Sequence, residues 1–90
     1  MRIERTERFD RRFGKLDRRI RLAFEKKLRL LLETYPHCPT GLNVEKLKKS
    51  KTNQHSFRVT RDYRVIFTFS GNALLLLDIV SHDEFDREFS

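Results

Sequence analysis

The stretch FRVTRDYRVIFTFSGNALLLLDIV, residues 57–80, decides the fold. Apolar and polar side chains alternate across residues 57–69, and a period of two places successive side chains on opposite faces of a β-strand. Ser70-Gly71-Asn72-Ala73 is a hairpin signal, because Gly-Asn readily supplies the positive φ that a tight turn needs. Residues 73–80 are nearly all apolar, which is typical of a strand covered on both faces. The stretch therefore predicts an antiparallel meander.

The residues before this meander follow the period of a helix. Apolar side chains advance by steps of four and three at Phe9, Phe13, Leu16, Ile20, Phe24, Leu28, Leu31 and Tyr35. This spacing places them on one face of an α-helix, which we expect to pack as core. Gly14 interrupts the run, and Thr6 and Asp17 are suitable N-caps. We expect a short helix over residues 6–13 and a longer one over residues 17–34, ended by Pro36 and Pro39.

These elements predict one α+β domain that spans residues 1–90. A short strand over Arg2–Arg5 opens it, and two N-terminal helices pack on one face of a roughly four-stranded antiparallel sheet. Ninety residues leave no room for a second core. The sequence shows no internal repeat, low-complexity segment or linker.

The composition points to an anionic partner. Lys and Arg outnumber Asp and Glu by 20 to 13, which gives a net charge of +7 and favours nucleic acid, the ribosome, an anionic membrane or an acidic protein. We expect no membrane association, because the longest apolar run, residues 74–77, is far too short for a span and no signal-peptide pattern opens the chain. The lone cysteine, Cys38, cannot form an internal disulfide or a zinc site, so the expected location is the cytoplasm.

The strand pattern also predicts a basic face. If the alternating apolar residues pack beneath the helices, Arg58 and Arg64 point to the opposite face, an exposed platform for RNA. Cleavage of RNA through its own 2′-hydroxyl requires no cofactor or metal, only proton transfer and cations around the phosphorane. We therefore predict Arg64, His82 and Arg58 as catalytic residues. In the alternative interpretation, His82 is an ordinary surface residue and Arg64 covers the sheet with its aliphatic stem.

A second group of side chains is predicted to bind RNA. It comprises Lys46, Lys48, Lys49, Lys51, Arg61, His55 and Phe85. The lysines precede the basic strand and would contact flanking phosphates, although such a run is also typical of a solvated loop. Phe85 and Phe89 either cap the core or stack on a base. His37 and Cys38, flanked by two prolines, are interpreted as ordinary loop residues.

The order of these segments resembles the RelE/ParE superfamily of toxins from type II toxin–antitoxin systems. The resemblance covers nearly the whole chain. Its parts are the helical hairpin, Glu45-Lys46-Leu47-Lys48-Lys49, Tyr63-Arg64-Val65-Ile66-Phe67, the Gly-Asn turn, the buried strand and Ser81-His82-Asp83-Glu84-Phe85. The succession of YRVIF, turn, buried strand and SHDEF is the most specific part.

The resemblance implies partners and residue roles. A cognate antitoxin would cover the basic surface in a toxin–antitoxin hetero-oligomer, and RelE-like members cleave mRNA in the ribosomal A site. By match to the family motif, Arg64 would contact the scissile phosphate, Arg58 would lie in the same site and His82 would act as acid or base. RelE has a tyrosine near its C-terminus and this chain has none there, so His82 would act with Asp83 or Glu84.

Three functions stay open on the sequence alone. The favoured one is a ribosome-dependent mRNA endoribonuclease toxin that inhibits translation. The second is a ParE-like, non-enzymatic inhibitor of DNA gyrase, and the third is a small basic RNA- or ribosome-binding module without toxicity. The acidic tail, residues 78–90, either packs on the basic surface of the same chain or is frayed.

Overall fold

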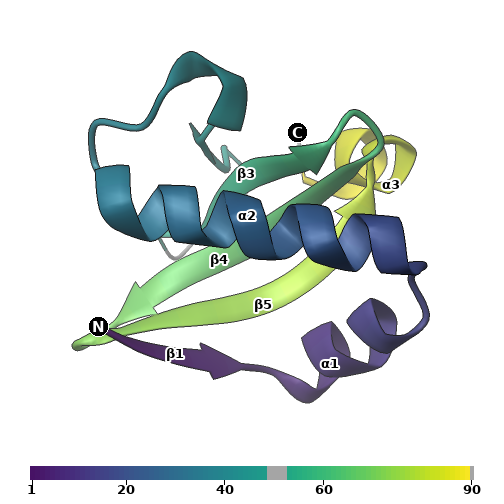
Figure 1. Ribbon diagram of the computed structural model, residues 1–90, viewed down its shortest axis with the longest axis horizontal. Coiled ribbons are helices and arrows are strands. Elements are labelled where there is room, and N and C mark those ends of the chain that lie inside the picture. Colours follow the sequence, from purple (N-terminus) through teal and green to yellow (C-terminus); the bar gives the residue numbers. More distant parts are fainter. Residues whose placement is uncertain (49–52, 90) are drawn as a thin grey trace.

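The computed structural model describes residues 1–48 and 53–89. The element order is β1 (Arg2–Arg5), α1 (Glu7–Gly14), α2 (Arg18–Thr34), the 3-10 turn η1 (Thr40–Leu42), β2 (Glu45–Lys46), β3 (His55–Thr60), β4 (Tyr63–Ser70), β5 (Ala73–Ser81) and α3 (His82–Glu88). The strands form one sheet in the order β1-β5-β4-β3-β2 (Figure 1). β1 runs parallel to β5, whereas the other neighbouring pairs are antiparallel.

The two N-terminal helices begin at the caps that the sequence predicts. The Thr6 hydroxyl oxygen accepts a hydrogen bond from the Phe9 N–H at 3.0 Å, and Asp17 accepts one from the Ile20 N–H at 3.1 Å. Each bond satisfies an N–H group that the first helical turn leaves without a partner. The Thr6 hydroxyl also donates to the Leu77 carbonyl at 2.8 Å, which fixes the start of α1 against β5.

The meander is confirmed. Gly71 adopts a φ of 59° in the turn between β4 and β5, a conformation that costs glycine little because it has no Cβ. A register shift between Ile66 and Phe67 marks a bulge in the β4–β5 pair. β3 and β4 pair closely enough to place Arg58 directly opposite Arg64.

The sheet carries apolar clusters on both faces. The larger cluster lies under α1 and α2 and includes Phe9, Phe24, Leu31, Phe57, Val59, Val65 and Phe67, with Phe13 and Tyr63 partly buried against it. The smaller one, on the other face, consists of Leu47, Ile66, Val80 and Phe85, with Leu77 and Phe89 packed against it. Figure 1 shows α2 lying across the sheet, while α3 folds at the end of β5.

The structure adds three features to the predicted architecture. β2 is a fifth strand of two residues, too short to show a period in the sequence. β1 pairs in parallel, which extends the expected antiparallel sheet to a mixed one. The tail forms α3. Its sequence is mostly charged and gives little sign of a packed helix, although Phe85 is buried. Because α3 packs on the second face, that face is partly covered instead of being the open platform expected above.

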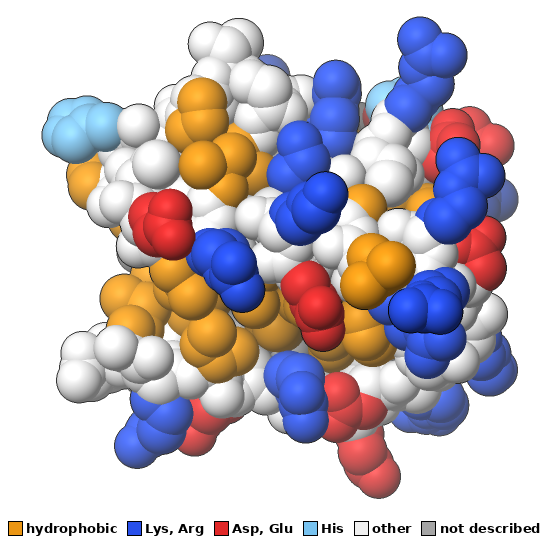
Figure 2. Space-filling view, in the orientation of Figure 1, with side chains coloured by type: hydrophobic (Ala, Val, Ile, Leu, Met, Phe, Trp, Pro, Cys, Tyr) orange, Lys and Arg blue, Asp and Glu red, His pale blue; other side chains and the backbone are white. Residues whose placement is uncertain are grey.

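Basic and apolar side chains separate on the surface around α2. Figure 2 shows Lys and Arg side chains over the N-terminal half of α2, and apolar side chains along its other side toward β1. Three exposed apolar residues, Met1, Leu32 and Tyr35, line one small pocket. No helix in the described ranges is long and apolar enough to cross a membrane.

Candidate functional site

Arg64 is the buried centre of the predicted site, with 4% of its surface exposed. It is the second residue of β4, and its side chain lies on the face of the sheet that α3 covers. Its Nε and Nη2 donate to the Ser56 hydroxyl at 3.0 and 2.8 Å, and Nη2 also donates to the Asn43 carbonyl. The guanidinium carbon lies 4.9 Å from the centre of the Phe85 ring, a cation–π contact.

Arg58 lies beside Arg64 and is exposed. Asn43 joins the two arginines from a left-handed backbone conformation, with a φ of 49°. The hydrogen-bond network assigns its amide oxygen to the side that faces them. There the oxygen accepts from Arg58 Nη2 and Arg64 Nη1, each at 3.2 Å. One neutral acceptor thus holds two guanidinium groups together, and we call Asn43, Ser56, Arg58 and Arg64 the arginine pair site.

The electrostatics of the arginine pair site favour an anion. Burial lowers the pKa of Arg64; the Glu45 carboxylate, 3.8 Å away and half exposed, acts against that shift, and the positive charge of Arg58 adds to it. An arginine nevertheless stays protonated in proteins. Two adjacent positive charges, one of them buried, repel each other, and the half-exposed Glu45 offsets this only in part, so a further bound anion would be stabilising. A phosphate, with several acceptor oxygens, suits such a fork of donors.

His82 occupies a different place. It is the first residue of α3; its backbone N–H donates to the Asp62 carbonyl at 2.7 Å, and its Nε2 lies 3.3 Å from an Asp86 carboxylate oxygen. An open depression of about 400 Å³, here called the His82 pocket, is lined by Asp62, Tyr63, Ser81, His82 and Asp83. Within residues 1–48 and 53–89, no hydrogen bond or ion pair joins His82 to either arginine of the pair.

The predicted RNA-binding residues are not gathered at one site. Lys46 lies opposite His55 in the β2–β3 pair, and both line a depression of about 380 Å³ beside Cys38. The His55 ring stacks on Phe67 of the large core, on the opposite face from the arginine pair site. Among residues 1–48 and 53–89, no group forms a hydrogen bond with the buried His55 Nδ1. Lys48 is exposed after β2, and Lys49 and Lys51 lie outside the described residues.

Two other predicted residues have definite positions. Arg61 is exposed in the turn between β3 and β4. Phe85 is buried in the smaller cluster, so of the two alternatives for this ring the structure shows the packed one. Phe89 stacks against it, with ring centres 6.1 Å apart.

Ion pairs hold α3 against the chain. Both Glu84 carboxylate oxygens accept from Arg12 Nη1 at 2.8 Å, and this hydrogen bond is the main cause of the raised pKa of Arg12. The buried Asp78 accepts from Arg8 at 2.8 Å and lies 3.6 Å from Arg12. Residues 78–89 therefore pack on the basic residues of α1 and are not frayed. This packing places Phe85 over Arg64.

The sequence analysis missed several residues of these sites. They are Asn43, Glu45 and Ser56 around the arginines, and Asp62 and Tyr63 beside His82. Ser56 stands two positions before Arg58, so strand alternation alone would have placed both on one face. No such signal exists for Asn43, which lies in a loop far from both arginines in the sequence.

No protein-family model and no curated protein sequence matches the chain. Solved structures do match. YafQ from Escherichia coli is 16% identical, with a TM-score of 0.77 over 94% of this chain and 98% of that one. The YoeB/ParE toxin from Agrobacterium tumefaciens is 21% identical, with a TM-score of 0.72 over 91% and 99%. In the RelE–RelB complex from Pyrococcus horikoshii the match is 20% identical, with a TM-score of 0.68 over 89% and 92%. The chain has the RelE-like toxin fold.

Proposed function

We propose that this protein is the toxin of a type II toxin–antitoxin pair and that it acts in the cytoplasm as a ribosome-dependent mRNA endoribonuclease. Three known structures with this fold are described as toxins or as a toxin–antitoxin complex. The net charge of +7 suits a ribosomal target, since cations that replace counterions on phosphates supply much of the affinity for RNA.

The arginine pair site is the observation that carries this proposal. Arg64 is buried with hydroxyl and carbonyl acceptors but without a carboxylate within ordinary hydrogen-bond distance in the described ranges. A protein that needed only stability at this position would do as well with an apolar side chain of similar volume. A buried cation beside a second cation is instead what a transition state of high negative charge requires.

The proposed reaction uses the RNA's own 2′-hydroxyl. The 2′-oxygen attacks the adjacent phosphorus while the bond from phosphorus to the 5′-oxygen breaks, which leaves a 2′,3′-cyclic phosphate and a free 5′-hydroxyl. Arg58 and Arg64 stabilise the phosphorane. His82 transfers a proton, either from the 2′-hydroxyl or to the 5′-oxygen, since an imidazole exchanges protons near neutral pH. Of the two acidic residues expected to act with His82, Asp83 lines the His82 pocket, whereas Glu84 is bound by Arg12.

A cognate antitoxin is the second partner in this proposal. YafQ has been solved with DinJ, and RelE with RelB. An antitoxin segment that covers the basic surface of this chain in a hetero-oligomer would compete with RNA for it, and an acidic side chain would satisfy Arg58 and Arg64 in place of the phosphate.

The test is primer extension on mRNA in a reconstituted translation system. We expect ribosome-dependent cuts from the wild type, and a loss of at least about 100-fold in Arg64→Lys, because lysine keeps the charge but loses the fork of donors. Arg58→Ala and His82→Ala should lose cleavage as well. The control is Arg29→Ala, an exposed change on α2. If Arg64→Lys and His82→Ala both cut as well as the wild type, the nuclease proposal is wrong.

A second candidate, inhibition of DNA gyrase, is favoured by one observation. Within the described part of the chain, no hydrogen bond or ion pair links His82 to the arginine pair, and a toxin that blocks a protein target needs no assembled catalytic site. One structure with this fold is described as a YoeB/ParE toxin. Induction in cells separates the two: trapped DNA breaks with translation intact would support the gyrase target, whereas arrested translation with intact DNA would exclude it.

A further inference from the structure

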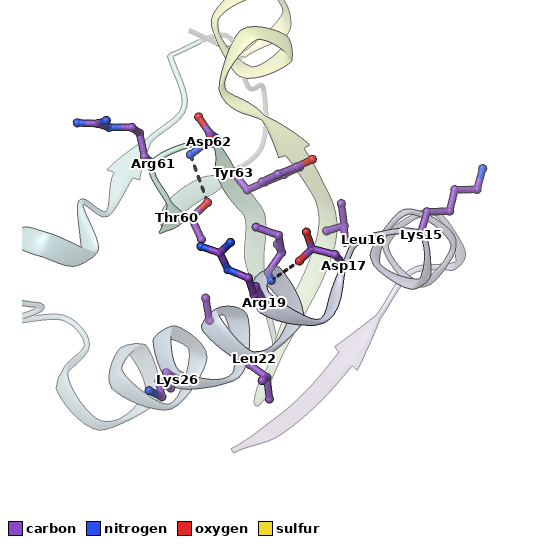
Figure 3. A pocket seen from close by; sticks show the side chains of 12 residues that line it. Lys15, Leu16, Asp17, Arg19, Leu22, Lys26, Thr60, Arg61, Asp62 and Tyr63 are labelled. Carbon is purple, nitrogen blue, oxygen red and sulfur yellow. Dashed lines mark hydrogen bonds between the residues drawn. The ribbon is translucent and has the colours of Figure 1, made fainter.

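A groove runs between the N-terminal half of α2 and the turn from β3 to β4. It has a volume of about 910 Å³. Figure 3 shows Arg19 reaching from α2 toward Thr60 in the turn, with the Tyr63 ring on the side of Leu16. None of the predicted catalytic residues lines this groove, which we call the α2 groove.

The α2 groove is positively charged. Its basic side chains are Lys15, Arg19, Lys26 and Arg61, and its acidic ones are Asp17 and Asp62. Asp17 is already bound as the N-cap of α2, so its carboxylate faces a helix N–H at 3.1 Å. The four basic residues come from three separate elements, the end of α1, α2 and the β3–β4 turn. If the basic residues of α2 served only solubility, there would be no reason for Arg61 to line the opposite side of the groove. The distribution therefore favours an anionic ligand in the groove.

The α2 groove and the His82 pocket share a wall. Asp62 and Tyr63 line both cavities. Asp62 lies in the β3–β4 turn, and Tyr63 is the first residue of β4. A chain that leaves the His82 pocket therefore passes Tyr63 and enters the α2 groove. Tyr63 is half-buried against the large core, which holds its ring in one place. A fixed aromatic ring between basic side chains is the arrangement on which single-stranded nucleic acids stack.

We propose that the α2 groove binds the single-stranded RNA that flanks the segment held at the His82 pocket. Arg19, Lys26 and Arg61 contact its phosphates, and one base stacks on Tyr63. The site reads no sequence, because every base has a π-face and every nucleotide a phosphate. This inference rests on the proposed function for its choice of RNA, but the groove, its charge and the shared wall stand without it.

Binding is measured by fluorescence anisotropy with the full chain and a single-stranded RNA whose 2′-hydroxyls are methylated, so that cleavage plays no part. The test variant is Arg19→Ala with Lys26→Ala. Its matched control is Arg18→Ala with Arg29→Ala, which removes the same charge from exposed positions of α2 outside the groove. We expect the test variant to bind about tenfold more weakly at low salt, and its slope of log affinity against log salt to fall by about 1.4, as for two lost phosphate contacts on a single strand.

A second variant separates stacking from charge. Tyr63→Phe should bind as the wild type does, whereas Tyr63→Leu should bind about 5- to 150-fold more weakly, the usual effect of losing one stacked base. Thermal unfolding of both variants shows whether the core is intact. If Tyr63→Leu is folded and binds normally, no base stacks there and the inference is wrong in that part.

Each outcome of the charge experiment decides the proposal. Equal losses in the test and control variants would assign the binding to the overall charge and overturn the groove. A polyglutamate peptide that binds the wild type, displaces the RNA and fails on the test variant would assign the groove to an acidic protein partner instead. If the test variant alone loses RNA affinity but the wild type shows no cleavage, the groove is an RNA-binding site and the proposed nuclease function is wrong.

Discussion

Asn43 has the most unusual position of any residue at the arginine pair site. Its backbone is left-handed, which costs most residues about 1–2 kcal/mol but is tolerated by asparagine. Its side chain contributes one neutral oxygen to Arg58 and Arg64. A neutral acceptor bridges the two arginines without cancelling their charge, so the pair can still attract an anion. A carboxylate at the same place would behave as a permanent substitute for the phosphate.

We therefore expect Asn43→Asp to separate stability from activity. The carboxylate has the shape of the amide and forms charge-assisted hydrogen bonds with both arginines, which should raise the free energy of unfolding by about 1 kcal/mol. Cleavage of mRNA should fall at least tenfold, because the anion site is occupied. Urea unfolding and primer extension measure the two effects. Asn72→Asp, the same charge change in the β4–β5 turn, is the control; an equal loss of cleavage there would contradict the interpretation.

At the scale of elements, α3 decides how accessible Arg64 is. Glu84 binds Arg12 of α1, and Phe85 covers the guanidinium of Arg64. The pKa of Arg12 is raised above its ordinary value in the folded protein, mainly by the hydrogen bond to Glu84. A cation whose pKa is raised by folding stabilises the fold below its unfolded pKa, and loses that contribution only as pH rises through the folded pKa. We call the Arg12–Glu84 ion pair the α3 tether. The contribution of the Arg12 charge to this tether is thus complete at neutral pH and is lost only in strongly alkaline solution.

Breaking this tether should loosen α3 while the rest of the sheet stays intact. Glu84→Gln keeps the shape of the side chain and removes its charge. Because the pair is partly buried, the cost should be about 1–2 kcal/mol in the free energy of unfolding. Amide hydrogen exchange should rise in residues 82–88 more than in β4. Asp83→Asn, on the exposed side of the same helical turn, is the control. Protection that falls equally across α3 and β4 would show that α3 and the sheet unfold as one unit.

The elements that sequence reasoning predicted are those with a clear period or cap. α1, α2 and the meander follow from spacing, from Thr6 and Asp17, and from the Gly-Asn turn, because local physics determines them. The arginine pair follows from strand alternation. Lys46 and His55 stay predictions as RNA-binding residues; they pair across β2 and β3, and the His55 ring stacks on Phe67, on the opposite face from the arginine pair. Asn43 and the separation of His82 from the arginines depend on contacts between distant segments, which no local pattern records.

At the scale of the whole molecule, net charge works against the compact state. A chain with a charge of +7 repels itself when folded, and its cations gather in places such as the arginine pair site and the α2 groove. Any anion that binds the folded form and not the unfolded one raises stability by mass action. Inorganic phosphate is the simplest probe of this effect.

Phosphate should therefore stabilise the protein more than chloride does at equal ionic strength. When phosphate exceeds its dissociation constant about sixfold, the stabilisation is about 1 kcal/mol, which corresponds to a rise in Tm of about 4–8 °C for a domain of this size. Differential scanning calorimetry measures the shift. Arg58→Ala should lose most of the excess over chloride, whereas Arg29→Ala should keep it. Identical shifts in phosphate and chloride would mean that salt acts only by screening.

The position of β1 links folding to protein synthesis. The first strand pairs with β5, so that Arg2 and Ala73 lie in register across seventy residues of chain. A growing polypeptide that has emerged as far as α2 contains the residues of α1 and α2. Its β1 strand cannot yet pair, because β5, its partner in the sheet, has not been translated. Arg64, too, is translated before β5 and α3, which enclose it. Pairing between segments so far apart in sequence slows folding in general, because loop-closure entropy is lost before the contacts form. The ribosome that the proposed toxin would attack must therefore translate β5 before β1 can pair and the sheet can form.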